Sequence, residues 1–186
     1  MAKVLSFLPA QLLTKTGLRA TAEVLASKKS VALYFSAHWC PPCRGFTPVA
    51  GDFYKSVAAT DASAFEVIFV SSDEGECAVP GYGLDLCQEL TVCLTPPSYP
   101  PHHHIHPHPH TDTESFQSYY DSMPWTSIAF DDEASRQELG SKFGVRGIPA
   151  LIVLNPAGEV VDKDGRGTLT KFKDSPAGAL SAWGAN

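Results

Sequence analysis

The sequence predicts an α/β fold in which helices flank a mixed central sheet. Two short runs rich in apolar and β-prone residues, 31–35 and 65–71, have the composition of buried strands. Helical patterns follow, and a third apolar run, 150–154, leads into a turn that returns the chain as the second arm of a hairpin. Strands that alternate with helices and then close in a hairpin indicate a mixed sheet.

Length and composition favour a single domain over residues 1–186. The chain of 186 residues is long enough for one ordinary domain and too short for two. Its 44% of hydrophobic and 18% of charged residues are typical of a soluble globular protein. The net charge of −6, without a basic run, argues against nucleic acid as a partner. No apolar run reaches the roughly 20 residues of a membrane span, so no membrane partner is expected.

The N-terminal residues have a weak targeting pattern. Residues 4–13 are apolar, and 20–22 resemble a small-residue cleavage site. However, Pro9 interrupts the apolar run, and Lys15 and Arg19 separate it from that site, unlike a normal signal peptide. We therefore expect a cytoplasmic protein, with the nucleus as the alternative location and organelle targeting disfavoured.

The first expected strand, 31–35, leads directly into a cysteine-containing turn and then a helix. After Pro42, apolar and aromatic side chains recur at helical spacing, namely Phe46, Val49, Phe53, Tyr54 and Val57. A proline in the first helical turn is tolerated, because the amide hydrogen that it lacks would be unpaired there. Pro48, farther along, should bend the helix.

The second half of the chain contains one further helix and a hairpin. Residues 131–143 have the pattern of a helix that Gly144 terminates. The third strand is followed by a turn at 155–158, and 159–161 are expected to pair with that strand.

Cys40 and Cys43 form the one cysteine pair with a meaningful spacing. Five cysteines in total, an odd number, disfavour a secreted disulfide scaffold, and a C-x-x-C motif in a reducing compartment indicates redox or metal chemistry. One helical turn brings two such side chains within bridging distance, and the helix start favours the thiolate of the first. Cys40 would attack a substrate disulfide, and Cys43 would resolve the mixed disulfide.

The residues around the motif refine this interpretation. Electrons would pass through the cysteines themselves, so we expect no bound organic cofactor. Pro41 and Pro42 should stiffen the loop in either redox state. The imidazole of His38 either tunes the pKa of Cys40 or is simply solvated. The alternative to redox chemistry is half of a zinc site, but the spacings of the other cysteines and histidines match no usual pattern, so no metal is expected.

Residues 75–113 fit neither a strand nor a helix, and we expect an inserted, disordered low-complexity loop. They carry Cys77, Cys87 and Cys93, several prolines and six of the seven histidines. Such a segment cannot bury a core. Clustered histidines bind zinc, copper or nickel, so a metal-binding loop is one hypothesis and a natural unstructured loop is another.

A third interpretation is that this segment is a translated intron. The codons of Gly75-Glu76-Cys77 can contain the splice-donor pattern GTGAGT, and those of His110-Thr111-Asp112 can contain an acceptor ending in ACAG. Histidine and proline codons are rich in C and would supply a pyrimidine tract. Removing 37 codons would join Glu74 through a new aspartate to Thr113. A mature transcript that keeps all 37 codons would contradict this interpretation.

Residues 34–48 closely resemble the active-site block of nucleoredoxins and tryparedoxins. The similarity continues at 67–73, 114–116, Tyr119-Tyr120, 123–125, 143–145 and 147–149. It covers most of the chain outside 75–113 and implies a thioredoxin-like fold. Parasite tryparedoxins favour serine where this chain has His38.

The resemblance also implies roles for residues outside the cysteine motif. The Ile148–Pro149 peptide bond would be cis beside the cysteines, and the backbone of Ile148 would pair with an extended substrate. The alternative is that Pro149 simply begins a strand. Trp39 would shield the thiolate and contact substrate, and Arg44 would complete the active-site loop. Trp125 also matches a family position, but core packing alone could explain it.

Two features depart from the family pattern. The family ends in a Phe-Pro-Trp-like motif, whereas this chain has Ser181-Ala182-Trp183, which leaves its C-terminal packing in doubt. No carboxylate lies on 31–35, so the buried proton acceptor that ordinary thioredoxins use there cannot be assigned.

Together these features predict a monomeric protein-disulfide reductase whose substrates are protein disulfides. An external reductant, either a reductase or a small dithiol, would return it to the dithiol state. The rival hypothesis is a redox-sensitive binding module that holds a protein partner and shows little turnover.

Overall fold

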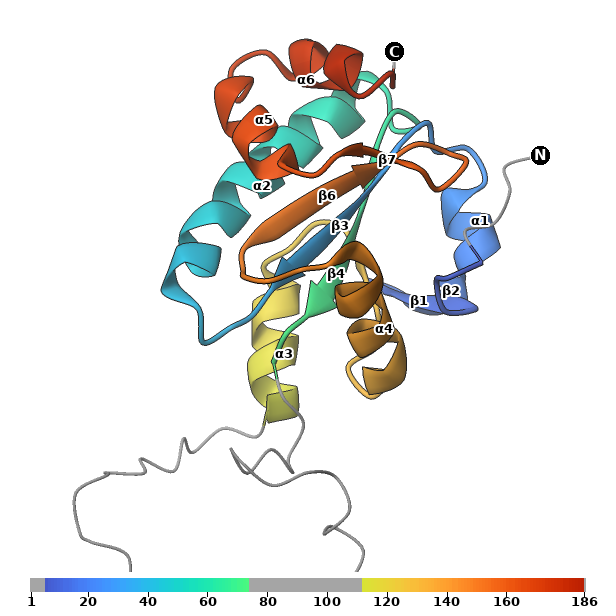
Figure 1. The fold of residues 1–186 in the computed structure, drawn as a ribbon, viewed down its shortest axis with the longest axis vertical. Helices are drawn as coiled ribbons and strands as arrows, with labels where there is room; N and C mark the ends of the chain where they lie inside the picture. The colour runs from blue at the N-terminus through green and yellow to red at the C-terminus, as the bar shows by residue number, and fades with distance from the viewer. Residues whose placement is uncertain (1–5, 74–111, 186) are drawn as a thin grey trace, which may run out of the picture.

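Helices cover both faces of a seven-stranded sheet in the computed structural model, which describes residues 6–73 and 112–185 (Figure 1). In chain order the elements are β1 (Gln11–Thr14), β2 (Gly17–Ala20), α1 (Thr21–Leu25), β3 (Val31–Ser36), α2 (Pro41–Thr60), β4 (Glu66–Ser71), α3 (Asp112–Asp121), β5 (Thr126–Ser127), α4 (Glu133–Phe143), β6 (Ala150–Leu154), β7 (Val160–Asp162), α5 (Gly165–Lys171) and α6 (Pro176–Ala182). Within the described ranges, no helix is long and apolar enough to cross a membrane.

The sheet is mixed, as expected, and its strand order is β2-β1-β5-β4-β3-β6-β7. β3 pairs in parallel with β4, from Val31 opposite Glu66 to Ser36 opposite Ser71. On its other side β3 pairs antiparallel with β6, and β7 completes the hairpin. All six residues of β3 are buried, so the turn that follows Ser36 leaves from the centre of the sheet.

The structure confirms the three expected strands to within one residue. β3 extends to Ser36, β4 begins at Glu66 instead of Phe65, and β6 has the expected bounds. Continuous apolar runs are typical of such strands, because both of their faces are buried.

The two expected helices are also present. α2 begins at Pro41 and runs through Pro48 to Thr60. α4 begins two residues later than expected, because the side chain of Asp132 caps it by accepting a hydrogen bond from the Ser135 amide at 3.2 Å. It ends before Gly144, whose φ of 64° lies in the left-handed region that favours glycine.

The N-terminal hairpin of β1 and β2 was not indicated by the sequence pattern. All four residues of β2 are exposed, so no apolar alternation marks that strand. The apolar run 4–13 nevertheless contributes Leu8 and Leu12 to the core, where Leu12 is fully buried.

The predicted loop and insertion at 75–113 lie outside the described residues, apart from two residues. Asp112 and Thr113 begin α3 and do not belong to the loop. This correction follows from packing, because α3 carries Phe116 and Tyr120 into the core.

The core has two parts, one on each face of the sheet. Ala32 and Tyr34 of β3 face the cluster that α2, α3, α5 and α6 cover. Val31, Leu33 and Phe35 face the opposite cluster, beneath α1 and α4. Alternate residues of one strand point to opposite faces, so β3 links the two clusters.

The C-terminal packing that the sequence left in doubt is supplied by Trp183. Its side chain is 3% exposed and stacks on Phe65 with a centroid distance of 5.2 Å. Its indole Nε1 donates to Asp162 at 2.9 Å. The tryptophan therefore closes the core even without the family's preceding Phe-Pro pair.

Candidate active site at Cys40 and Cys43

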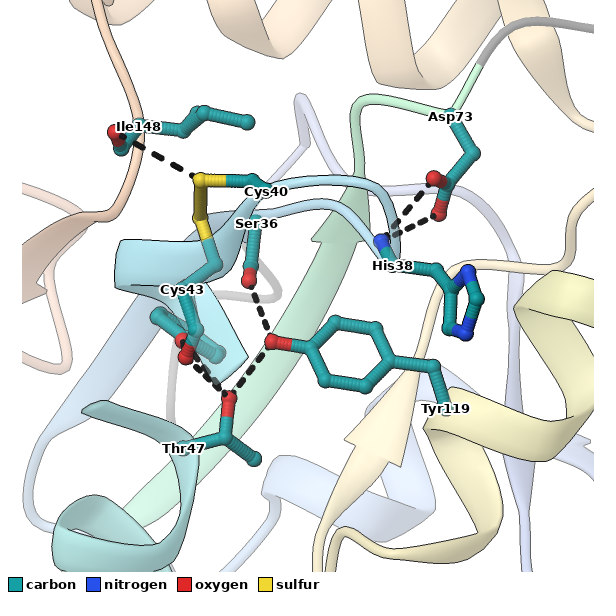
Figure 2. Close-up of a disulfide and its surroundings, with 9 residues drawn as sticks. Ser36, His38, Cys40, Cys43, Thr47, Asp73, Tyr119 and Ile148 are labelled. Atoms are coloured by element: carbon teal, nitrogen blue, oxygen red, sulfur yellow. Dashed lines mark hydrogen bonds between the residues drawn. A yellow bond between two sulfur atoms is a disulfide. The ribbon is translucent and has the colours of Figure 1, made fainter. Parts of the chain in front are cut away.

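Cys40 and Cys43 lie where the turn after β3 enters α2, and they form a disulfide (Figure 2). Their Cα atoms are 5.2 Å apart, within the usual range for a disulfide. Cys40 is the residue before the first helical turn, and Cys43 lies in that turn. The exposed fractions of the two residues are 4% and 0%. In the reduced state, the free amides and dipole of the helix start would favour a thiolate on Cys40.

The Ile148–Pro149 bond is cis, as the resemblance implied, and it adjoins the disulfide. The carbonyl oxygen of Ile148 lies 4.0 Å from the Sγ of Cys40. The half-buried side chain of Ile148 packs against Cys40 and Cys43. β6 begins at the next residue after Pro149, so the central sheet holds this segment against the cysteines.

The rim around the buried sulfurs is formed by exposed residues of the same loop. Trp39 is 62% exposed. Pro41, Pro42 and Arg44 are also exposed, whereas His38 is half-buried. The candidate residues thus gather in one place, and their assigned roles in substrate contact stay predictions. Trp125, in contrast, is 2% exposed in the core, which favours packing.

Asp73 is a site residue that the sequence reasoning missed. Its carboxylate accepts a hydrogen bond from the His38 amide at 2.9 Å and another from the Ser71 hydroxyl at 2.7 Å (Figure 2). Asp73 is 5% exposed. Burial raises the pKa of its carboxyl, and the hydrogen bonds from Ser71 and His38 oppose that rise. A buried carboxylate therefore holds the active-site loop from the end of β4, although none lies on β3.

Arg136 supports this arrangement from α4. Its Nη1 donates to the backbone carbonyls of Ser71 at 3.1 Å and Asp73 at 2.8 Å. The residue is 7% exposed, and burial lowers the pKa of its guanidinium. The end of β4 is thus held between the active-site loop and α4.

A group of buried hydroxyls lies on the other side of Cys43. Thr47 donates to the Cys43 carbonyl at 3.0 Å and lies 2.6 Å from the Tyr119 hydroxyl (Figure 2). That hydroxyl is in turn 2.8 Å from Ser36. The Tyr34 hydroxyl lies 2.8 Å from Thr47 and 3.4 Å from the Cys43 carbonyl. The resemblance covered Tyr119, but nothing in the sequence placed it against the cysteine turn.

An open groove of about 460 Å³ lies between α2 and α3, beside this hydroxyl group. His38 and Arg44 of the active-site loop line it, together with Thr47 and Tyr119. The ring of His38 meets that of Tyr119 edge-on, with centroids 6.1 Å apart. The structure therefore places His38 between the groove and the loop, which leaves both interpretations of its imidazole open.

The described residues contain no group of three or more His, Cys, Asp or Glu side chains that could hold a metal ion. The histidine tract at 102–110 lies outside them, so metal binding there stays a hypothesis.

Comparison with known proteins identifies the family. The model of the thioredoxin-like family matches residues 28–79 and 105–160. Tryparedoxin of Trypanosoma brucei brucei is 33% identical over 186 residues, which cover 98% of this chain and 99% of that protein. Nucleoredoxin of Mus musculus is 36% identical over 144 residues, which cover 77% of this chain and 24% of that protein. The chain thus spans about a quarter of the length of the nucleoredoxin that it matches.

Solved structures confirm the thioredoxin-like fold. Tryparedoxin I from Crithidia fasciculata has 29% sequence identity and a TM-score of 0.65, with 91% of this chain and 92% of that one covered. Thioredoxin from Wuchereria bancrofti has 31% identity and a TM-score of 0.63, with 96% of each chain covered. The family model matches more than half of the residues, and the full-length match to tryparedoxin agrees with it. The chain belongs to the thioredoxin-like family.

Proposed function

We propose that this chain is a thiol–disulfide oxidoreductase that reduces protein disulfides. The observation that carries the proposal is the Cys40–Cys43 disulfide at the start of α2, with the Ile148 carbonyl beside it. Sulfurs that are almost completely buried within an exposed rim suit a reaction in which the substrate must dock before exchange occurs. The family membership supports the same chemistry.

The reaction has two exchange steps. The Cys40 thiolate attacks a substrate disulfide, the substrate S–S bond breaks, and the departing sulfur takes a proton. The Cys43 thiol then loses its proton and attacks the Sγ of Cys40. The bond from Cys40 to the substrate breaks, the second substrate thiol leaves, and the Cys40–Cys43 disulfide remains. An external reductase or small dithiol supplies two electrons and two protons to restore the dithiol, and loss of one proton from Cys40 then regenerates the thiolate.

Substrate would dock along Ile148 and Pro149. The Ile148 carbonyl offers an acceptor to an extended peptide, in the manner of an added strand. Trp39, whose exposed indole lies next to Cys40 in the chain, would contact the substrate. One solved relative is tryparedoxin II complexed with glutathionylspermidine, which favours a small molecule as a reductant to test. We further propose that the protein works as a monomer, in the cytoplasm or nucleus, without an organic cofactor.

Reduction of insulin disulfides by dithiothreitol tests this function. We expect catalytic turnover by the wild type, none by Cys40→Ser, and a trapped one-to-one mixed disulfide with Cys43→Ser. A folded wild type that does not accelerate the reaction would refute the proposal. If that protein bound a partner in one redox state only, the binding-module hypothesis would take its place.

A further inference from the structure

The buried hydroxyls around Cys43 form a chain with a defined direction. A hydroxyl has one proton and two lone pairs. With the Thr47 proton given to the Cys43 carbonyl, Thr47 accepts from Tyr119, and Tyr34 donates either to Thr47 or directly to that carbonyl, which lies 3.4 Å from its hydroxyl. Because the Tyr119 proton then points to Thr47, Tyr119 accepts a hydrogen bond from the Ser36 hydroxyl. Burial raises the pKa of Tyr34, so this phenol keeps its proton.

All of these protons therefore point toward one acceptor, the carbonyl of Cys43. Three elements contribute, since Ser36 ends β3, Thr47 lies in α2 and Tyr119 lies in α3. Hydrogen bonds in such a chain polarise one another, and they are stronger in a low-dielectric interior than in water. Cys43 is 0% exposed, so its carbonyl is shielded from bulk water.

This carbonyl belongs to the residue whose sulfur must become an anion in the second exchange step. The negative end of its dipole opposes a thiolate on the same residue, and a donated proton offsets part of that charge. The same bonds hold the first turn of α2 against β3 and α3. Cys40 has different partners: its amide donates to the Ala37 carbonyl at 3.3 Å, and its sulfur faces Ile148.

We propose that Tyr119 is a positioning residue for the resolving step, acting through Thr47 on Cys43 and leaving the attack by Cys40 unaffected. This inference rests on the proposed exchange chemistry. In the step concerned, the Cys43 thiolate bonds to the Sγ of Cys40, the bond from Cys40 to the substrate sulfur breaks, and that sulfur leaves with the electron pair and takes a proton. No additional oxidant or reductant takes part.

Tyr119→Phe and Tyr120→Phe form a matched pair for the test. Both tyrosines are buried in α3, but the Tyr120 hydroxyl donates to the Leu13 carbonyl at 2.9 Å, in β1. Each variant loses one phenol hydroxyl of similar environment. A general loss of stability should therefore appear in both variants, whereas an effect that acts through Cys43 should appear only in Tyr119→Phe.

Two rates are measured on each protein. Alkylation of the reduced enzyme by iodoacetamide across a pH series, followed by mass spectrometry at Cys40 because the chain has five cysteines, reports the Cys40 thiolate. Release of thionitrobenzoate from a mixed disulfide made chemically at Cys40 reports the resolving step. We expect Tyr119→Phe to slow the release about fivefold, as the loss of one hydrogen bond would. Its alkylation rate and pH profile should match the wild type, and Tyr120→Phe should change neither rate.

Thr47 provides a second pair. Thr47→Ser keeps the hydroxyl and should keep the release rate, whereas Thr47→Val should slow it at least as much as Tyr119→Phe. Equal release rates in Tyr119→Phe and wild type, equal slowing in both tyrosine variants, or slowed alkylation in Tyr119→Phe would each overturn the inference. Because the mixed disulfide is made chemically, a wild type without insulin turnover would refute the proposed function and still leave these comparisons readable.

Discussion

Replacing Asp73 with asparagine separates the two roles of this buried carboxylate, in stability and in holding the active-site loop. The variant keeps an oxygen that can accept from the His38 amide. Its new amide group can donate to the Ser71 hydroxyl, which now donates to Asp73. The Ser71 hydroxyl loses the acceptor of its own proton but still accepts from the amide of residue 73 at 3.0 Å, so we expect Asp73→Asn to fold.

The size of the effect follows from the charge of the acceptor. A hydrogen bond to a carboxylate contributes about 1.5–3 kcal/mol, against about 0.5–1.5 kcal/mol for a neutral pair. The bond that holds the His38 amide should therefore weaken by about 1 kcal/mol. The population of molecules whose active-site loop is displaced should then rise roughly fivefold. Hydrogen exchange of the His38 amide, which requires that displacement, should therefore speed up by a similar factor. At pH 7, the free energy of unfolding should not fall by more than about 1 kcal/mol, because asparagine avoids burying a charge.

The pH dependence provides a signed test. Burial raises the pKa of Asp73 above its usual value of 3.8, so the folded protein binds a proton in a pH range where the unfolded chain does not. The contribution of Asp73 to the free energy of unfolding therefore rises as pH falls through the raised pKa toward 3.8. The stability of Asp73→Asn relative to the wild type should fall over the same range.

Urea unfolding of both proteins between pH 7 and pH 4 measures this difference, with Asp52→Asn as control. Asp52 lies in α2, and its side chain is 84% exposed, so its replacement should change neither stability nor exchange of the His38 amide appreciably. The reasoning would be refuted if Asp73→Asn gained stability relative to the wild type on acidification. An unchanged exchange rate of the His38 amide would refute the part that concerns the loop.

Three further substitutions test other parts of the structure. Trp39→Ala should raise the KM for insulin severalfold, as measured by steady-state kinetics. Because the indole is exposed, the free energy of unfolding in urea should change by less than about 0.5 kcal/mol. Trp183→Ala should lower the free energy of unfolding in urea by about 3–4 kcal/mol, because it removes a buried indole from its stack on Phe65. A decrease below about 1 kcal/mol would contradict that packing. Lys28→Met should lower the free energy of unfolding in urea by about 3 kcal/mol, because the buried carboxylate of Glu66 loses its ion pair at 2.8 Å. Adding Glu66→Gln should recover part of that loss.

Much of the fold could be predicted because its strongest elements depend on local patterns. The three central strands are continuous apolar runs, and α4 lies between a capping aspartate and a glycine. The N-terminal hairpin could not be predicted in this way. The residues of β2 are exposed on both faces, and its place in the sheet comes from pairing with β1, which in turn pairs with β5 far along the chain.

The candidate site likewise has one part that the sequence predicts and another that it does not. The spacing of Cys40 and Cys43 at a helix start is enough to indicate exchange chemistry, because one helical turn fixes how close the two sulfurs can lie. The groups that hold this turn could not be found in the same way. Asp73 reaches the His38 amide across 35 positions, and Tyr119 reaches Ser36 across 83. Chemistry that depends on neighbouring residues can be predicted from sequence, whereas the hydrogen bonds that tune it depend on how distant segments pack, which no local pattern encodes.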